Sequence, residues 1–159
     1  MSWYGDGLNF SCISGCTKCC ERPGSVYVSE EEMVRIANHL KISIDEFKSK
    51  YTRQMDNSIT LATTDKGCVF VETGKGCSIY PVRPKQCSTY PFWSQIVADR
   101  SRWIQHKEDF CPGIETGNKV DAFVIERAIK ESDDIFGVSN NERKIGSQRT
   151  IANSQIAHI

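Results

Sequence analysis

A chain of 159 residues with 39% hydrophobic and 25% charged side chains has the composition of a globular protein and can bury one core. Its 20 basic and 20 acidic residues cancel, so bulk charge gives no reason to expect nucleic acid or an anionic membrane as a partner. No stretch approaches the roughly 20 apolar residues that span a bilayer. The first residues lack the basic start and apolar run of a secretory signal, so we expect a cytoplasmic protein.

The N-terminal third of the chain predicts a loop followed by two helices. Residues 1–25 are rich in Gly, Ser and Cys, which is typical of an irregular loop that carries ligands. Two Ser-x-x-Glu capping boxes follow, and each precedes apolar residues at helical spacing. They predict two short amphipathic helices, over about 30–40 and 44–54.

The middle of the chain predicts short strands and irregular segments. Residues 59–63 and 68–72 favour two short strands, and a Gly-Lys-Gly turn follows at 74–76. Three prolines lie within residues 80–92, and that density excludes a central strand or a long helix. We expect this segment to be irregular.

The C-terminal third predicts a hairpin and then a helix. Residues 92–97 and 102–106 favour two paired strands, and a turn follows at Cys111-Pro112-Gly113. A final helix is predicted from Val120 to near Gly137, with Asn118 as its cap. Its apolar face is expected to contain Val120, Phe123, Val124 and Ala128.

Together these elements predict the α+β class. We expect a small, irregular, cysteine-rich and metal-stabilised domain with two short N-terminal helices, short strands and a C-terminal helix. The cysteine-cluster domain should cover residues 1–136. Residues 137–159 are polar and contain few apolar side chains, which is typical of a mobile tail.

Cysteine is the residue type that most strongly indicates a function. Four of the eight cysteines fall within nine residues, and the full set is Cys12, Cys16, Cys19, Cys20, Cys68, Cys77, Cys87 and Cys111. Without a secretory signal the expected compartment is reducing, which disfavours disulfides and leaves thiols available as metal ligands. Thiolates two or three residues apart in a loop can converge on one soft metal or on the irons of a cluster. We therefore expect a metal-binding protein that uses all eight cysteines.

Cys19 and Cys20 raise the question of how the ligands are divided. Because adjacent side chains tend to point apart, we expect these two thiolates not to bind the same tetrahedral ion. One group would contain Cys12, Cys16 and Cys19 with a distal cysteine, and the other would contain Cys20 with the remaining three. A bridged centre with two metals would also separate them.

The spacing Cys-x3-Cys-x2-Cys also occurs around the cluster of radical S-adenosylmethionine enzymes. Those enzymes alternate strands and helices in a larger barrel-like domain, and the present sequence lacks that alternation. The spacing alone therefore does not support that class.

The ordered combination of cysteine motifs resembles the CxxCxxCC family of zinc- or iron-chelating domains, which also includes flagellin lysine N-methylases. The residues that carry the resemblance are Cys12-x3-Cys16-x2-Cys19-Cys20, Gly67-Cys68, Gly76-Cys77, Arg83-Pro84, Cys87, Tyr90-Pro91 and Cys111-Pro112-Gly113. They cover roughly residues 10–113. The resemblance implies a zinc site or an iron–sulfur cluster built from these cysteines. The first gap holds three residues, whereas the family name implies two.

Several functions agree with this resemblance. Zinc would make the centre structural and the chain a protein-interaction module, with a protein partner that the sequence leaves open. Iron–sulfur would permit electron transfer, sensing or catalysis. Analogy to the flagellin-modifying relatives adds a methyltransferase-like enzyme, but no catalytic residue can be named from the sequence.

Three residues near the cysteines are candidates for supporting the metal site. Arg83 could offset the negative charge of a sulfur-rich centre, or it could be an ordinary surface arginine. Tyr80 and Tyr90 could shield the centre from water, although aromatic side chains close to one another in sequence are more often part of a core.

Overall fold

The computed structural model describes residues 2–137, which divide into two compact units. Unit 1 contains residues 2–13 and 89–137, and unit 2 contains residues 14–88. The single domain over 1–136 stays a prediction. The tail predicted for 137–159 lies, apart from Gly137, outside the described residues.

Unit 2 contains the two predicted N-terminal helices, α2 (Glu30–Leu40) and α3 (Ile44–Tyr51). The capping box of α2 is formed, because the Ser29 hydroxyl accepts from the Glu32 amide and the Glu32 carboxylate accepts from the Ser29 amide. Helix α3 ends three residues before the predicted boundary, since the chain continues directly into a strand. A further short helix, α1 (Lys18–Glu21), lies within the segment predicted as irregular.

The strands of unit 2 form three small antiparallel hairpins. Strands β2 (Thr52–Met55) and β3 (Ser58–Leu61) pair over four residues each. Strands β4 (Thr63–Thr64) and β5 (Gly67–Cys68) form the second hairpin, and β6 (Val71–Glu72) and β7 (Gly76–Cys77) form the third. The single strand predicted over 68–72 is therefore wrong, because its two ends belong to different hairpins.

The remaining elements of unit 2 lie in the proline-rich segment. They are the 3-10 helix η1 (Tyr80–Val82) and the short helix α4 (Lys85–Thr89). The last residue of α4, Thr89, already belongs to unit 1. Neither is long, as the prolines predicted.

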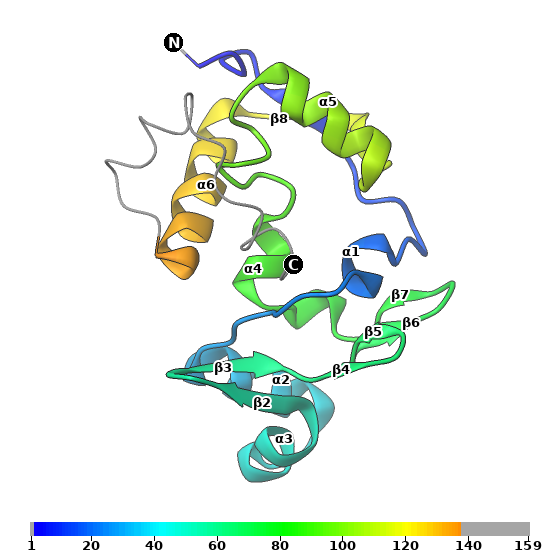
Figure 1. Cartoon of the computed structure of the whole chain (residues 1–159), viewed down its shortest axis with the longest axis vertical. Helices are drawn as coiled ribbons and strands as arrows, with labels where there is room; N and C mark the ends of the chain where they lie inside the picture. Colours follow the sequence, from blue (N-terminus) through cyan, green and yellow to red (C-terminus); the bar gives the residue numbers. More distant parts are fainter. Residues whose placement is uncertain (1, 138–159) are drawn as a thin grey trace. The chain divides into compact units, whose positions relative to one another are not determined.

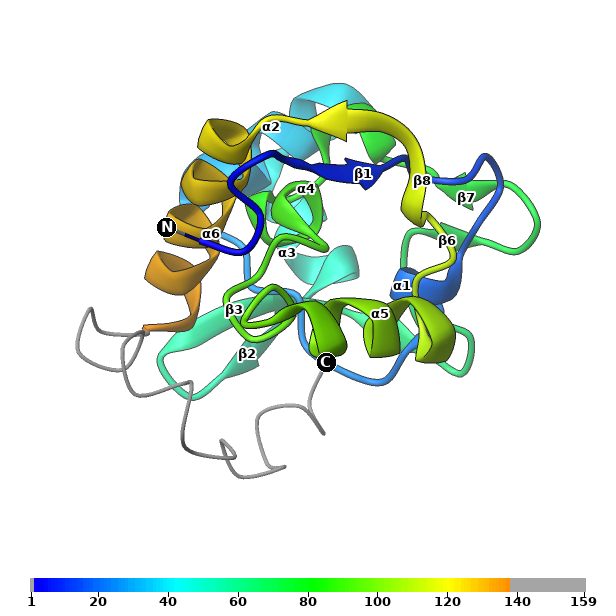
Figure 2. The same ribbon diagram turned by 90° about the horizontal axis from the view of Figure 1, so that it is seen from above.

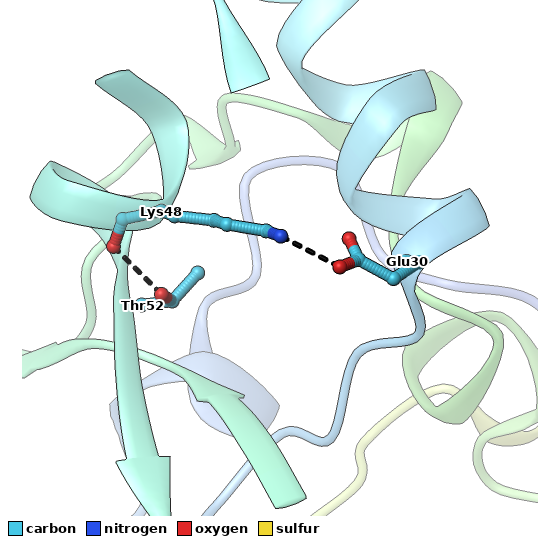
Figure 3. Close-up of polar contacts among 3 residues, drawn as sticks. All are labelled: Glu30, Lys48 and Thr52. Atoms are coloured by element: carbon cyan, nitrogen blue, oxygen red, sulfur yellow. Dashed lines mark hydrogen bonds and ion pairs between the residues drawn. The ribbon is translucent and has the colours of Figure 1, made fainter. Parts of the chain in front are cut away.

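A hydrophobic core joins α2, α3 and the hairpins of unit 2 (Figure 1). Its buried members are Val28, Met33, Ile36, Ala37, Phe47, Leu61, Phe70 and Ile79. Figure 3 shows how α3 is also tied at its surface: Lys48 donates to Glu30 of α2 at 2.6 Å, and Thr52 donates to the Lys48 carbonyl at 2.7 Å. The exposed ion pair adds little, since solvent screens it.

Unit 1 is built on two strands that are far apart in the sequence. Strand β1 (Leu8–Phe10) pairs antiparallel with β8 (Ile114–Val120), with an irregular step between Asn9 and Phe10 (Figure 2). Both strands were missed, because β1 lies in the segment predicted as a loop and β8 in one predicted to lead into a helix. Their pairing anchors the N-terminal residues to the C-terminal half of the chain.

Helix α5 (Arg100–Asp109) occupies the place of the predicted hairpin over 92–97 and 102–106, so that prediction is wrong. The physical reason is local, because the Asp99 carboxylate accepts from the Arg102 amide at 2.8 Å and caps a helix. Trp103 then lies on the inner face of α5, is fully buried and stacks on Phe92.

Helix α6 (Ala122–Phe136) confirms the predicted C-terminal helix and its end at Gly137. Its cap is Asp121 rather than Asn118, because β8 continues to Val120. The predicted apolar face is wrong as well: Phe123 is 73% exposed. The buried face contains Ile125, Ile129, Ser132 and Asp133 instead.

The α+β class is confirmed: the predicted helices α2 and α3 precede the hairpins, the strands form short antiparallel pairs, and α6 is the C-terminal helix. Among residues 2–137, none of the helices has the length and hydropathy needed to cross a membrane.

Candidate metal centre

Helix α1 brings two thiols together at the surface of unit 2. Cys19 and Cys20 occupy its middle, and their Sγ atoms lie 3.9 Å apart. The Thr17 hydroxyl donates to the Glu21 carboxylate at 2.6 Å and closes this single turn. The expectation that these adjacent side chains diverge is therefore wrong.

Two consecutive hairpins present Cys68 and Cys77 in equivalent positions. Each cysteine follows a glycine with φ near +110° and pairs with the first strand of its own hairpin, at Thr63 and Val71 respectively. The amides after the cysteines donate at 2.9 Å to equivalent carbonyls, Val69 to Ala62 and Ser78 to Phe70. The residues two positions after the cysteines, Phe70 and Ile79, are both buried.

This repetition was visible in the sequence as Gly67-Cys68-Val69-Phe70 and Gly76-Cys77-Ser78-Ile79, nine residues apart. This repeat was not predicted. The signal was the shared order of glycine, cysteine, any residue and an apolar residue.

Gly67 allows the first of these hairpins to approach α1. A Cβ atom at this position would collide with the Cys20 carbonyl and lie 2.7 Å from the Glu21 Cα atom. Only glycine combines that contact with its positive φ angle. The backbone of β5 therefore lies directly against the helix that carries Cys19 and Cys20 (Figure 1).

Cys20 couples two neighbouring thiols through hydrogen bonds. Hydrogen bonding with Cys20 is the largest influence on the pKa of Cys19 and of Cys77, and it lowers each from 9.0 to about 7. The same bonds raise the pKa of Cys20, which keeps its proton. In the metal-free chain Cys20 therefore keeps its proton to higher pH than Cys19 and Cys77 do.

Cys68 and Cys87, in contrast, have raised pKa values. Burial raises the pKa of Cys68, and burial together with the charges of Cys68, Cys19 and Cys77 raises the pKa of Cys87. These mutual effects show that the five thiols of Cys19, Cys20, Cys68, Cys77 and Cys87 lie near one another. We call this set the unit 2 thiol cluster.

Arg83 supplies positive charge to the cluster. Its guanidinium lowers the pKa of Cys19, Cys77 and Cys87, although in each case another effect is larger. The guanidinium lies over the Tyr80 ring at 3.9 Å and donates to the Tyr80 carbonyl at 2.8 Å. Tyr80 itself is 45% exposed, so it holds Arg83 more than it shields the thiols from water.

The coupling makes a prediction about thiol reactivity in the metal-free chain. Cys77 is expected to reach half its maximal rate of alkylation by iodoacetamide near pH 7, because the thiolate is the reactive species. Cys68, in the equivalent hairpin, should require a pH above 9.0. Mass spectrometry of peptides alkylated between about pH 6 and about pH 10 would measure both curves.

The lowered pKa of Cys77 also makes the stability of the fold depend on pH. A lowered pKa of Cys77 in the folded chain contributes stability that is complete above the unfolded value of 9.0 and is lost as the pH falls through about 7. Coincident alkylation curves for Cys77 and Cys68 would contradict the proposed hydrogen bonding around Cys20.

The other candidate residues are distributed over both units. Cys16 lies in unit 2 and is partly buried, whereas Cys12 and Cys111 belong to unit 1. Tyr90 also belongs to unit 1, where its hydroxyl and His106 Nε2 share a hydrogen bond of 2.7 Å. The predicted group of Cys12, Cys16 and Cys19 is therefore divided between the two units.

The donor set of the unit 2 cluster fits a thiophilic metal. Thiolates are the ligands that zinc and iron–sulfur centres prefer, and tetrahedral zinc with Zn–S bonds of about 2.3 Å has sulfurs about 3.8 Å apart. The Cys19–Cys20 separation of 3.9 Å agrees with that edge. Within residues 2–137, however, no three or more Cys, His, Asp or Glu side chains stand in the arrangement of a formed metal site.

Comparison with known proteins identifies a family and a curated relative. Over 95 residues the chain is 34% identical to a Methanocaldococcus jannaschii protein named "Uncharacterized protein MJ0661", covering 58% of this chain and 50% of that protein. The chain thus spans about half the length of this curated relative. No solved structure matches. A family model described as "Putative zinc- or iron-chelating domain" matches residues 11–112, a range that includes all eight cysteines. This chain therefore belongs to the CxxCxxCC family.

Proposed function

We propose that unit 2 chelates a single zinc ion through cysteine thiolates. Cys19, Cys20 and Cys77 supply three ligands, and Cys87 or Cys68 supplies the fourth. The observation that carries this proposal is the 3.9 Å contact between the Sγ atoms of Cys19 and Cys20, together with the mutual effects of Cys20 and Cys77 on each other's pKa.

The sulfur separation favours one ion over a cubane cluster. Four cysteines hold a [4Fe–4S] cluster, so each thiolate binds a different iron and the ligands lie farther apart than two sulfurs on one ion. A [2Fe–2S] cluster, with two thiolates on each iron, also agrees with a short separation and is the second candidate. The 3.9 Å distance between the Sγ atoms of Cys19 and Cys20 agrees with both a single zinc ion and a [2Fe–2S] cluster.

Charge supports the same assignment. Four thiolates around a divalent ion leave a net charge of about −2, since each ligand must be deprotonated. Arg83 lies within electrostatic reach of Cys19, Cys77 and Cys87 and offsets part of this charge. Because Cys20 holds a proton in the metal-free chain, binding should release it.

A four-thiolate zinc site leaves no open coordination position, so the proposed role of the metal is structural. This favours a protein-interaction module in a cytoplasmic setting over an enzyme. Methyl transfer rests on family analogy alone, which is a poor guide to activity.

All eight cysteines stay in the proposed ligand set. The proposed zinc centre uses four of them from unit 2. Cys12, Cys16, Cys111 and the cysteine of unit 2 that this centre leaves unused stay ligands proposed from the sequence alone.

Chemical analysis of anaerobically purified protein tests the proposal. We expect at least one zinc ion per chain, no acid-labile sulfide and no visible absorbance, as a d¹⁰ ion bound by thiolates requires. Iron and sulfide in equal amounts with a brown colour would overturn the zinc assignment in favour of a cluster. Iron without sulfide would retain the single-ion site and change its metal.

A further inference from the structure

Gln86 is a buried polar residue that the metal site itself does not use. Its side chain is 2% exposed, and it immediately precedes Cys87 on α4. Its Nε2 donates to the Ser25 carbonyl at 3.0 Å, and its Oε1 accepts from the Tyr27 amide at 2.9 Å. Both ends of the amide therefore bind the backbone of one short segment, as a neighbouring strand would.

The segment that Gln86 binds leads directly from the thiols of α1. It follows Cys19 and Cys20 by a few residues in the sequence and forms backbone hydrogen bonds with strand β3 of the hairpin β2–β3. The Leu61 amide donates to the Val26 carbonyl at 2.8 Å, and the Val28 amide donates to the Ile59 carbonyl at 3.0 Å. The segment thus runs between β3 and the Gln86 side chain.

Two side chains of α2 hold the residues just before Gln86. The Glu32 carboxylate accepts from the Lys85 amide at 2.7 Å and from the Ser29 amide at 2.8 Å. Arg35 donates to the Arg83 carbonyl at 3.3 Å. Side chains of α2 therefore help to hold the segment that carries Arg83 and Cys87.

We infer that Gln86 is a positioning residue of the metal centre. Its amide connects the helix that carries Cys87 to the segment that leaves Cys19 and Cys20, and so it sets the spacing between two groups of ligands. This inference rests on the proposed metal-binding function. Removal of the Gln86 amide would leave the Ser25 carbonyl and the Tyr27 N–H without this partner. Because unsatisfied buried backbone groups cost free energy, the connection is costly to break.

The first test compares Gln86→Met with wild type in zinc and cobalt titrations. Methionine preserves the volume of the side chain and removes both hydrogen bonds. Zinc affinity is expected to fall by about tenfold to a hundredfold, the usual effect of losing a group that orients metal ligands. The thiolate-to-cobalt charge-transfer absorption should also weaken, because fewer thiolates reach the ion.

Gln105→Met is the matched control, since Gln105 is exposed on α5 in unit 1. A purely structural role of Gln86 would lower the unfolding temperature while leaving the zinc affinity and the cobalt spectrum of the folded protein unchanged. That result would overturn the inference. Absence of zinc binding by the wild type would instead overturn the proposed function and the inference with it.

A second measurement on wild type decides the matter if Gln86→Met does not fold. If Gln86 couples the two ligand groups, zinc must in return stabilise its hydrogen bonds. Hydrogen exchange of the Tyr27 amide should therefore become at least about tenfold slower in the zinc-loaded chain. An unchanged rate for Tyr27, together with measured zinc binding, would contradict the positioning role.

Discussion

Cys77→Ser is expected to lower the zinc affinity of the chain by about a hundredfold or more. Zinc bound by four thiolates contributes about 10–16 kcal/mol, or about 2.5–4 kcal/mol for each ligand, and every 1.4 kcal/mol corresponds to about a factor of ten. Serine cannot replace a thiolate, and the change also removes one hydrogen-bond partner of Cys20. Competition with a chromophoric chelator would measure the affinity.

Thr73→Ser is the matched control for this variant. Thr73 lies in the exposed turn of the same hairpin, β6–β7, so it tests whether any change there affects binding. Circular dichroism should accompany both titrations, because Cys77 also packs against the core of unit 2. Equal zinc affinities for Cys77→Ser and Thr73→Ser would exclude Cys77 as a ligand.

The parts of the fold that the sequence predicted correctly are those with strong local signals. Ser29 and Ser43 are the N-caps of α2 and α3, and both helices start where these residues place them, although only Ser29 forms the complete capping box. Gly137 ends α6 with a positive φ angle of 67°. In each case the deciding interactions lie within a few residues of one another.

The errors arise where a helix cap that was overlooked, burial or a distant contact overrides a local pattern. Residues 102–106 contain aromatic and β-branched side chains that favour a strand, but the Asp99 cap and the burial of Trp103 select a helix. Strand β8 contains Gly117 and Asn118, which indicate a turn in isolation. Its pairing with β1, more than a hundred residues earlier, cannot be derived from local sequence.

The candidate site shows the same division between chemistry and geometry. Cysteine spacing correctly indicated the family, but it could not show which thiols meet. The spacing of Cys12 and Cys16 suggests a common site, and this stays a prediction because Cys12 belongs to unit 1 and Cys16 to unit 2. The contact between Cys19 and Cys20 depends on the side-chain conformations within one helical turn, which spacing does not determine.

Phe70→Ala is expected to destabilise the chain by about 3–5 kcal/mol, as large-to-small changes of a buried aromatic residue do. Phe70 is 4% exposed and stacks on Tyr51 and Phe47, with ring centroids 5.0 Å and 6.3 Å away. Its carbonyl also accepts from both the amide and the hydroxyl of Ser78. Phe70 lies between β5 and β6, so it connects the Cys68 hairpin to the Cys77 hairpin. Denaturant unfolding of the metal-free chain would measure the loss.

Phe123→Ala is the control of equal chemistry, because Phe123 is 73% exposed and should cost less than about 0.5 kcal/mol. Phe70→Ala should in addition weaken zinc binding, since both hairpins that carry ligands depend on Phe70, and zinc in excess should restore part of the lost stability by mass action. Loss of stability with unchanged zinc affinity would show that the two hairpins hold their cysteines independently of the core. In that case the equivalent positions of Cys68 and Cys77 would follow from the Gly-Cys turns alone.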